Sequence, residues 1–488
     1  MNMKNRFAAM VALGLAVLSG PGWAADYFVW KGTEADSVRD YTKYDVADDA
    51  GKDSGTAATE ALPDGSVVFV PQNGTFHAVD ADFSFLNTLA GLRPMVGSST
   101  IVFEIESDQH YDGYVYGFGT GTPVTAKVYK KGIGTLTLNY ADKVDGKNYY
   151  GYYAAWHVEQ GVLSILPDIA STDATRYYYR MTIAEGAEVK MPYGKGTTYL
   201  KNGLCGGGTI SHEAVSGANA RLQICGSCTT PFSGKITGDL HVRAYGTCVL
   251  TGTESDFTNG AFEFYGGDIS AVDFGETSSV PSSLGGIGKP FTVTSEGMFL
   301  TSLLDETTAP KTCEREFRNW STTGGTTQFS GGPYGDFTFQ GTIRMYAKDS
   351  AACRLVLTGD HTRPCTFKPG RVDTAAAYES YYTLVKRGKG TWTFTPGTTA
   401  MGRMSVICGV LVEDGLVQFG YLRSKGVKTA YTSFGFMTNS YPYVFTGYAY
   451  SGKNVDRTAP GVDYQFRLGK ADDLTQNGMM EYIGKEDV

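Results

Sequence analysis

Alternating apolar and polar positions run through most of the chain, and glycines separate the stretches in which they occur. Residues 181–189, 240–250 and 291–300 each contain two short alternating stretches on either side of a glycine. A period of two is typical of a strand with one buried face, and glycine permits the tight turn between two strands. No long segment has the 3.6-residue periodicity of an amphipathic helix, so the pattern predicts an all-β protein.

One unit of this kind occurs twice, at residues 131–138 and 387–394. Both copies read basic, Gly, any residue, Gly, Thr, apolar, Thr, apolar. A turn followed by a half-buried strand cannot bury its apolar face alone, so it has to stack on neighbours. The glycine turns recur at separations that fit multiples of ~20–25 residues, within the repeat range of solenoids. We therefore expect a parallel β-helix (β-solenoid), with a series of β-sandwiches as the alternative.

The N-terminus has the pattern of a secretory signal peptide. Lys4 and Arg6 precede an apolar stretch at 7–18, and small residues follow it, which places the expected cleavage between Ala24 and Ala25. The apolar stretch is shorter than the ~20 residues that a membrane-spanning helix needs. We therefore expect an exported protein, secreted, periplasmic or at the outer surface, with no transmembrane helix after signal removal.

The pattern divides the rest of the chain into three parts. Residues 25–110 contain irregularly spaced strands, and we expect them to form an N-terminal β-rich capping segment. Residues 111–422 carry the regular strand-and-turn pattern of the parallel β-helix. Residues 423–488 are rich in tyrosine and phenylalanine and form the expected C-terminal β-rich cap or tail. A solenoid needs such caps because its ends otherwise expose apolar surface and unpaired strand edges.

Composition and charge narrow the range of partners. The net charge is −8, which argues against nucleic acid and anionic lipid surfaces as partners. No cofactor is expected. The charge does not indicate the oligomeric state, so that stays open.

Four of the eight cysteines have a regular spacing. Cys205 and Cys225 are 20 residues apart, and so are Cys228 and Cys248. If one turn of the solenoid has ~20 residues, each pair lies on adjacent turns and forms a structural disulfide or a cysteine stack. Cys225 and Cys228 also form a C-x-x-C motif, for which redox chemistry or a metal site is the less favoured alternative, so no metal is expected.

Tyrosine clusters are the best lead to a binding surface. Two of them are Tyr149, Tyr150, Tyr152 and Tyr153, and Tyr177, Tyr178 and Tyr179. In a solenoid, side chains one turn apart stack into ladders, so these tyrosines could line a flat aromatic face that binds a polysaccharide or a surface protein. The alternative is that the rings stack in the core.

The repeated unit resembles a known family. Residues 131–138 followed by 158–163, and 387–394 followed by 406–411, are similar to the autotransporter-associated (passenger-associated) β-strand repeat. The resemblance implies a right-handed parallel β-helix that is exported and displayed at the cell surface or released. The tail is too short for the membrane barrel in which autotransporters end, so a secreted solenoid or a fragment of a larger surface protein is expected.

The expected function is non-catalytic: cell-surface structure, adhesion, or contact with glycans or proteins. The first alternative is a carbohydrate-active enzyme, a polysaccharide lyase or glycoside hydrolase, which needs suitably placed carboxylates. Asp268 with Asp273, or Asp108 with Asp112 beside His110, are the candidates for that chemistry. The second alternative is a structural fragment of a larger surface protein.

Overall fold

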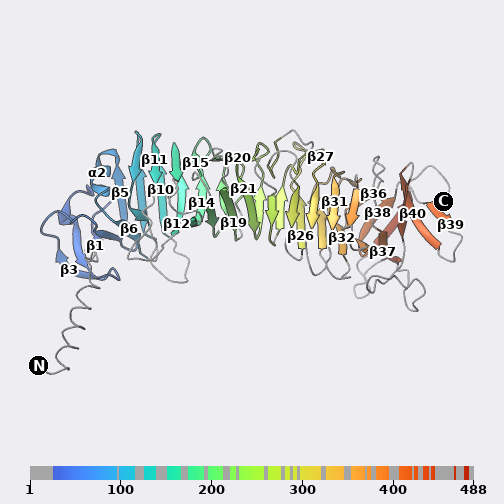
Figure 1. The fold of residues 1–488 in the computed structure, drawn as a ribbon, viewed down its shortest axis with the longest axis horizontal. Helices are drawn as coiled ribbons and strands as arrows, with labels where there is room; N and C mark the ends of the chain where they lie inside the picture. The colour runs from blue at the N-terminus through green and yellow to red at the C-terminus, as the bar shows by residue number, and fades with distance from the viewer. Residues whose placement is uncertain are drawn as a thin grey trace, which may run out of the picture. The chain divides into compact units, whose positions relative to one another are not determined.

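The chain is an all-β protein whose parallel sheets stack as a β-solenoid (Figure 1). This confirms the fold class that the alternating pattern predicts. The parallel pairing of successive strands excludes the β-sandwich alternative, since sandwiches are built from antiparallel sheets. Two compact units divide the chain, Met1–Tyr179 and Arg180–Val488.

The computed structural model describes residues 26–482 with gaps, and after Gln418 it describes only the backbone of the strands. The gaps are 96–97, 116–125, 139–150, 166–173, 192–195, 213–219, 227–229, 258–261, 267, 276–280, 286–289, 294–296, 320–325, 346–352, 369–370, 375–380, 395–405, 420–422, 427–431, 439–440, 446–465 and 469–477. The expected signal peptide, with its cleavage between Ala24 and Ala25, lies outside the described residues.

The first unit contains thirteen described strands before its last one and three short helical turns. The strands are β1 (Tyr27–Trp30), β2 (Tyr44–Ala47), β3 (Asp53–Ala57), β4 (Val67–Val70), β5 (Thr75–Val79), β6 (Gly91–Pro94), β7 (Thr100–Glu104), β8 (Gln109–Tyr111), β9 (Tyr114–Val115), β10 (Lys127–Lys131), β11 (Thr135–Leu138), β12 (Gly151–Val158) and β13 (Val162–Ile165). The helical turns are η1 (Tyr41–Lys43), η2 (Asp80–Asp82) and α2 (Phe83–Leu86).

Three parallel stacks make up the first unit. One runs β1-β4-β6-β9, with the antiparallel pair β2-β3 added at its edge; the second is β5-β7-β10-β12; the third is β8-β11-β13. In the second stack, Phe76, Ile101, Val128 and Trp156 lie in register and are fully buried. Inward residues of successive turns therefore form a continuous apolar column, as the period-two pattern requires.

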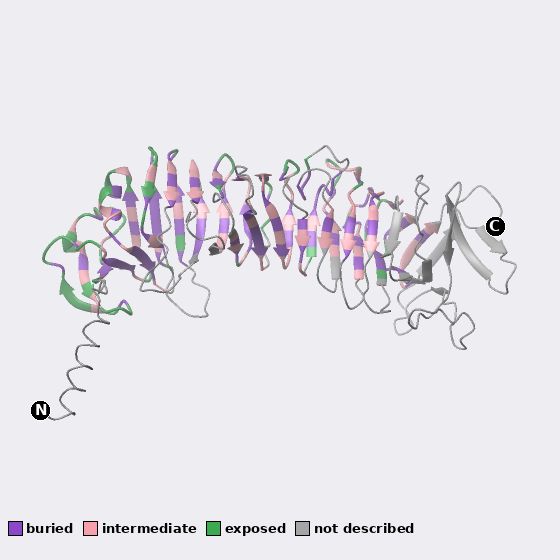
Figure 2. Cartoon of the chain, viewed as in Figure 1, coloured by how far each residue is buried: buried purple, intermediate pink, exposed green. Residues whose placement is uncertain are grey.

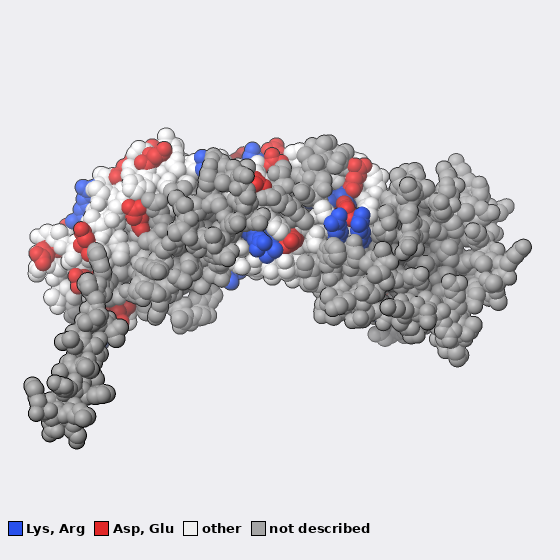
Figure 3. Space-filling model, in the orientation of Figure 1, with Lys and Arg blue, Asp and Glu red and all other residues white. Residues whose placement is uncertain are grey.

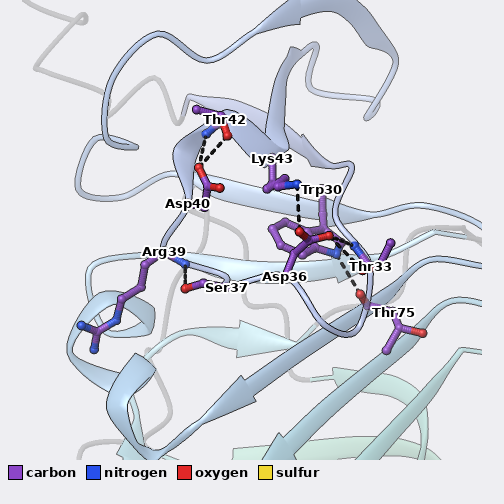
Figure 4. Close-up of polar contacts among 9 residues, drawn as sticks. All are labelled: Trp30, Thr33, Asp36, Ser37, Arg39, Asp40, Thr42, Lys43 and Thr75. Atoms are coloured by element: carbon purple, nitrogen blue, oxygen red, sulfur yellow. Dashed lines mark hydrogen bonds and ion pairs between the residues drawn. The ribbon is translucent and has the colours of Figure 1, made fainter.

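A polar loop closes the N-terminal edge around Trp30 (Figure 4). The buried Trp30 indole donates to the Thr75 carbonyl at 2.8 Å. In the loop that follows, Asp36 accepts from the Thr33 amide at 2.7 Å and pairs with Lys43 at 2.8 Å. These contacts hold the pKa of Asp36 at about 2, below its usual value, mainly through the hydrogen bond from Lys43. The loop is thus ordered by its own polar contacts.

The second unit continues the same construction. Its strands are β14 (Ala174–Ile183), which begins before the boundary, β15 (Glu188–Lys190), β16 (Gly196–Leu200), β17 (Leu204–Gly206), β18 (Thr209–His212), β19 (Ala220–Cys225), β20 (Lys235–Gly238), β21 (His241–Tyr245), β22 (Cys248–Leu250), β23 (Phe262–Phe264), β24 (Asp268–Ala271), β25 (Phe291–Val293), β26 (Gly297–Ser302), β27 (Lys311–Cys313), β28 (Phe317–Asn319), β29 (Thr326–Ser330), β30 (Phe337–Phe339), β31 (Thr342–Met345), β32 (Cys353–Thr358), β33 (Cys365–Phe367), β34 (Arg371–Thr374), β35 (Tyr381–Lys386), β36 (Thr391–Phe394), β37 (Val406–Val412), β38 (Gly415–Phe419), β39 (Arg423–Gly426), β40 (Thr432–Thr438), β41 (Tyr441–Phe445), β42 (Phe466–Leu468) and β43 (Gly478–Tyr482).

Buried and half-buried residues alternate along these strands (Figure 2). In the stack β16-β19-β21-β23-β25-β28-β31-β34, the inward residues Phe262, Phe291, Phe317 and Ile343 are buried and lie in register. The rings of Phe262 and Phe291 stack with their centroids 5.3 Å apart. The inward face is therefore filled by side-chain columns, and the outward face of the same strands is available for other roles.

The pattern changes at the C-terminal end, where β39, β40 and β41 pair antiparallel. β42 and β43 return to parallel pairing, with β37 and β38 respectively. In the part of the chain that the structure describes, no helix has the length and apolar character needed to cross a membrane.

Candidate functional site

A fully buried lysine organises the first copy of the repeated unit. The Lys130 ammonium donates to the carbonyls of Lys131 and Gly132, at 2.9 and 2.7 Å, and to the carbonyl of Gln160 on the next turn, at 3.1 Å. One amino group therefore satisfies carbonyls of two successive turns. We call this arrangement the lysine hub.

The second copy repeats the lysine hub. Lys386 is also fully buried, and its ammonium donates to the carbonyls of Arg387 and Gly388 at 2.7 and 2.5 Å and to that of Asp414 at 3.2 Å. Burial lowers the pKa of Lys130 and of Lys386 to about 8, although nearby carboxylates raise it. Every described contact of these lysines serves the backbone, which identifies the hub as a structural centre.

The glycine that follows each lysine by two positions is required by geometry. Gly132 has φ +73°, and a Cβ there would lie 2.1 Å from the carbonyl oxygen of Ile105 on the preceding turn. Gly388 has φ +72°, and its Cβ would lie 2.7 Å from the carbonyl oxygen of Gly359. Both the left-handed backbone and the close approach of two turns therefore select glycine.

The repeated motif, at 131–138 and 387–394, does not include the buried lysines. It starts at Lys131 and Arg387, whereas the buried hub residues precede them. A signal for the hub exists in the sequence: Lys130 and Lys386 occupy inward positions of their alternating strands, two residues after Val128 and Leu384. A charged residue at an inward position, twice before the same glycine motif, indicates a buried group with dedicated partners.

The outward face of the second unit carries a continuous polar column. One outward residue from each of seven neighbouring strands lies in register with the next. We call this column the outer ladder; its residues are Tyr199, Gln223, Arg243, Glu263, Thr292, Arg318 and Arg344. Successive positions are separated by the strand spacing, ~4.8 Å.

Glu263 is the centre of one charged cluster on the outer ladder. Its carboxylate pairs with Arg243 at 2.7 Å and with His241 at 3.2 Å, and it accepts from the Tyr265 hydroxyl at 3.0 Å. Burial alone would raise the pKa of Glu263, but the hydrogen bond and charge of His241, together with Arg243, outweigh it and hold the pKa at about 2. Glu263 is therefore a permanent anion and cannot act as a general acid near neutral pH.

A second charged cluster lies further along the outer ladder. Glu316, just before β28, pairs with Arg318 at 2.8 Å and with Arg344 at 2.6 Å. The two clusters together contain three arginines and two glutamates, in a chain whose net charge is −8. Figure 3 shows basic and acidic side chains occurring together on one face of the molecule. The outer ladder is thus locally more basic than the protein as a whole.

Stacked tyrosines flank the first cluster. The rings of Tyr245 and Tyr265 are nearly parallel, at 5°, with their centroids 4.4 Å apart. The Tyr265 hydroxyl donates to Glu263, so the stacked pair is part of the first charged cluster.

The predicted tyrosine clusters fall largely outside the described side chains. Tyr149 and Tyr150 lie outside the described residues; Tyr152 and Tyr153 belong to β12, and Tyr177 and Tyr178 to β14, with only their backbone described. Tyr179 is half-buried in β14. Their role as a binding face stays a prediction.

The predicted cysteine pairs are not bridged. Cys225 and Cys248 have free thiols, so neither Cys205–Cys225 nor Cys228–Cys248 is a disulfide in this structure. Cys205 is itself disulfide-bonded, and Cys228 lies outside the described residues. The register explains the difference: Leu200 pairs with Ile224, 24 positions later, so a 20-residue spacing does not align Cys205 with Cys225.

Two of the four candidate acidic residues for catalysis accept hydrogen bonds from backbone amides. Asp108 accepts from the Thr135 amide at 2.8 Å, and the buried Asp273 accepts from the Gly275 amide at 2.7 Å. Asp112 lies 3.8 Å from His110 in an exposed pair, and Asp268 is exposed at the start of β24. Among the described residues, no group of three or more His, Cys, Asp and Glu side chains is arranged to hold a metal ion.

No protein-family model, curated protein or solved structure matches this chain.

Proposed function

We propose that this chain is an exported, non-catalytic β-solenoid that binds an extended anionic polysaccharide along the outer ladder. The observation that carries the proposal is the register of Arg243, Arg318 and Arg344 in one column of parallel strands. Arg318 and Arg344 occupy neighbouring positions, ~4.8 Å apart, and Arg243 lies three positions before Arg318, ~14 Å away, so the three cations follow one line across the strands.

The chemistry of the outer ladder favours an anionic ligand. A guanidinium has five N–H donors, and in the described contact between Arg243 and Glu263 the arginine uses Nε. Guanidinium groups bind carboxylates with directional, charge-assisted hydrogen bonds. Each glutamate fixes the position of its arginine, which reduces the entropy that ligand binding would otherwise cost.

We also propose that the chain is exported and that its repeated unit is a passenger-associated repeat. The N-terminal signal pattern supports export to the cell surface or beyond. The resemblance of residues 131–138 and 387–394 to the passenger-associated repeat agrees with export, and the lysine hubs at Lys130 and Lys386 indicate that the two copies are the same structural unit.

The test uses the mature chain, residues 25–488, with immobilised polygalacturonate and with neutral dextran. We expect retention on polygalacturonate that weakens as salt rises and no release of new chain ends. The double variant Arg318→Gln, Arg344→Gln should bind at least ~10-fold more weakly, since two charge-assisted contacts are lost. Arg354→Gln is the matched control, because Arg354 is exposed on β32, outside the outer ladder.

Three results would contradict the proposal. Release of unsaturated or reducing ends would make the chain a carbohydrate-active enzyme. Equal loss of binding in Arg354→Gln and in the double variant would remove the outer ladder as the site. Absence of retention on any polysaccharide would favour the structural role.

A further inference from the structure

Arg93 is a buried cation in the first unit, far from the outer ladder in sequence. Arg93 lies in register with Phe69 and Val29 in the sheet that contains β1, β4, β6 and β9, and only 8% of the residue is exposed. Among the described residues, Arg93 has no carboxylate within ion-pair distance, and its buried Nε has no hydrogen-bond partner. This is unusual, since buried arginines are normally paired.

Three aromatic rings surround the guanidinium. Its central carbon lies 5.8 Å from the ring centroid of Tyr27, 5.7 Å from that of Phe69 and 5.6 Å from that of Tyr114. We call these three rings the Arg93 cage. Phe69 also forms an apolar cluster with Val29 and Val67, and Tyr27 and Tyr114 pack against this cluster.

The backbone is adapted to this arrangement. Gly91 pairs with Tyr114 in the neighbouring strand, and a Cβ at Gly91 would lie 2.7 Å from three atoms of the Tyr114 ring. The absence of a side chain at residue 91 therefore lets the Tyr114 ring lie across the strand beside Arg93. The cage depends on this glycine.

The energetics of the cage leave a role for an anion. Cation–π attraction to three rings offsets part of the cost of removing the guanidinium charge from water, but it supplies no hydrogen-bond acceptor for the N–H groups. The chain has 50 acidic residues against 42 basic ones, yet no described carboxylate pairs with Arg93. A carboxylate from a ligand would satisfy both the charge and the planar donor geometry of the guanidinium.

We propose that the Arg93 cage is a binding site for a uronic acid, with the carboxylate on the Arg93 guanidinium and the sugar ring against Tyr27 and Tyr114. Both tyrosines are half-buried at the rim, and their rings provide apolar area for the CH groups of a saturated ring. The site is separate from the outer ladder, and its occupation does not depend on the function proposed for that ladder.

The test titrates galacturonate into the mature chain labelled with ¹⁵N-arginine. The Arg93 Nε–H resonance is assigned by its absence from the spectrum of Arg93→Lys. We expect galacturonate to shift this resonance, and methyl galactoside and acetate at equal concentration to shift it much less. Calorimetric titration with galacturonate compares Arg93→Lys with Arg93, both in the double variant Arg318→Gln, Arg344→Gln. Binding should weaken at least ~10-fold in Arg93→Lys, because an ammonium cannot form the bidentate pair.

A second variant distinguishes the contribution of the aromatic rings from that of the Arg93 charge. Gly91→Ala keeps Arg93 but displaces the Tyr114 ring, so galacturonate binding should weaken while acetate binding does not change. The double variant of the outer ladder, Arg318→Gln with Arg344→Gln, should leave the Arg93 shift intact. Equal shifts from galacturonate and methyl galactoside, or no shift at all, would overturn the proposal; equal shifts from acetate and galacturonate would overturn the recognition of the sugar ring.

Discussion

At the scale of single residues, the notable feature is that two buried lysines bind only backbone carbonyls. Lys130 and Lys386 each join two turns through three hydrogen bonds. A buried charge is tolerated when all its donors are satisfied. The lysine hub therefore stabilises the turn at a place where side-chain columns cannot reach.

Replacing the hub lysine tests this role. Lys130→Met keeps the apolar stem but leaves three carbonyls without their donor, and we expect the free energy of unfolding to fall by about 2–4 kcal/mol. Lys131→Met, at the half-buried neighbouring position, should change it by less than ~0.5 kcal/mol. Thermal and denaturant unfolding of both variants measure the difference. Equal effects at the two positions would contradict the hub.

The pKa of Glu263 gives a pH-dependent prediction. Because the folded-state pKa is held at about 2, below the value of 4.5 for an unperturbed glutamate, the charged form contributes stability above pH ~4.5. That contribution is lost as the pH falls towards 2. Glu263→Gln should therefore be less stable than the wild type by about 1–3 kcal/mol at pH 7. The two proteins should converge at pH 2 in denaturant titrations, and a constant difference would refute the assignment.

At the scale of elements, the turns are defined by how closely successive backbones approach. Gly132 and Gly186 both have positive φ, +73° and +81°, but a Cβ at Gly132 would collide with a carbonyl oxygen, whereas no atom lies within 4 Å of a Cβ at Gly186. A side chain at Gly186 would therefore meet only backbone strain, whereas one at Gly132 would meet both backbone strain and a steric collision.

Alanine substitution at these two glycines should give different costs. Gly186→Ala carries only the left-handed backbone penalty, ~1–2 kcal/mol. Gly132→Ala adds the collision with Ile105 and should cost at least about 3 kcal/mol. Denaturant unfolding of both variants measures the two costs, and equal values would show that close approach does not matter at Gly132.

The elements also show what the sequence could predict. Period-two alternation identified inward residues such as Phe291 and Leu300, because strand geometry fixes which side chains share a face. It could not fix the register, because turn lengths vary. Arg221 pairs with His241, 20 positions later, but Phe262 pairs with Phe291, 29 positions later. The outer ladder depends on that register and was therefore not predicted. The alignment of the cysteine pairs also depends on it, and the predicted disulfides between them are not formed.

The Arg93 cage also could not be predicted from the sequence. Arg93, Tyr27 and Tyr114 come together because β1, β4, β6 and β9 pair in parallel across long loops. Local periodicity contains no information on such pairing. The lysine hub, in contrast, could have been predicted, because a charged residue occupies an inward position of an alternating strand in both copies.

At the scale of the whole molecule, stability should be a sum of local terms. In a solenoid each turn contacts only its neighbours, and the two hubs lie in different compact units. Lys130→Met should therefore increase hydrogen exchange around residues 127–138 and leave 381–394 as in the wild type, and Lys386→Met should do the reverse. The effects on unfolding should add within ~0.5 kcal/mol. Loss of protection in both regions from either substitution would indicate a single cooperative unit.

The lysine hub has a consequence for how such a chain can lengthen. The lysine and its most distant acceptor are 30 residues apart in the first copy and 28 in the second. The distant acceptor is a backbone carbonyl, which any residue can supply, so a duplicated whole turn that followed the same path would present an equivalent acceptor. Insertion or deletion of part of a turn would instead move that carbonyl out of reach, so the chain is expected to lengthen or shorten over evolutionary time by whole turns.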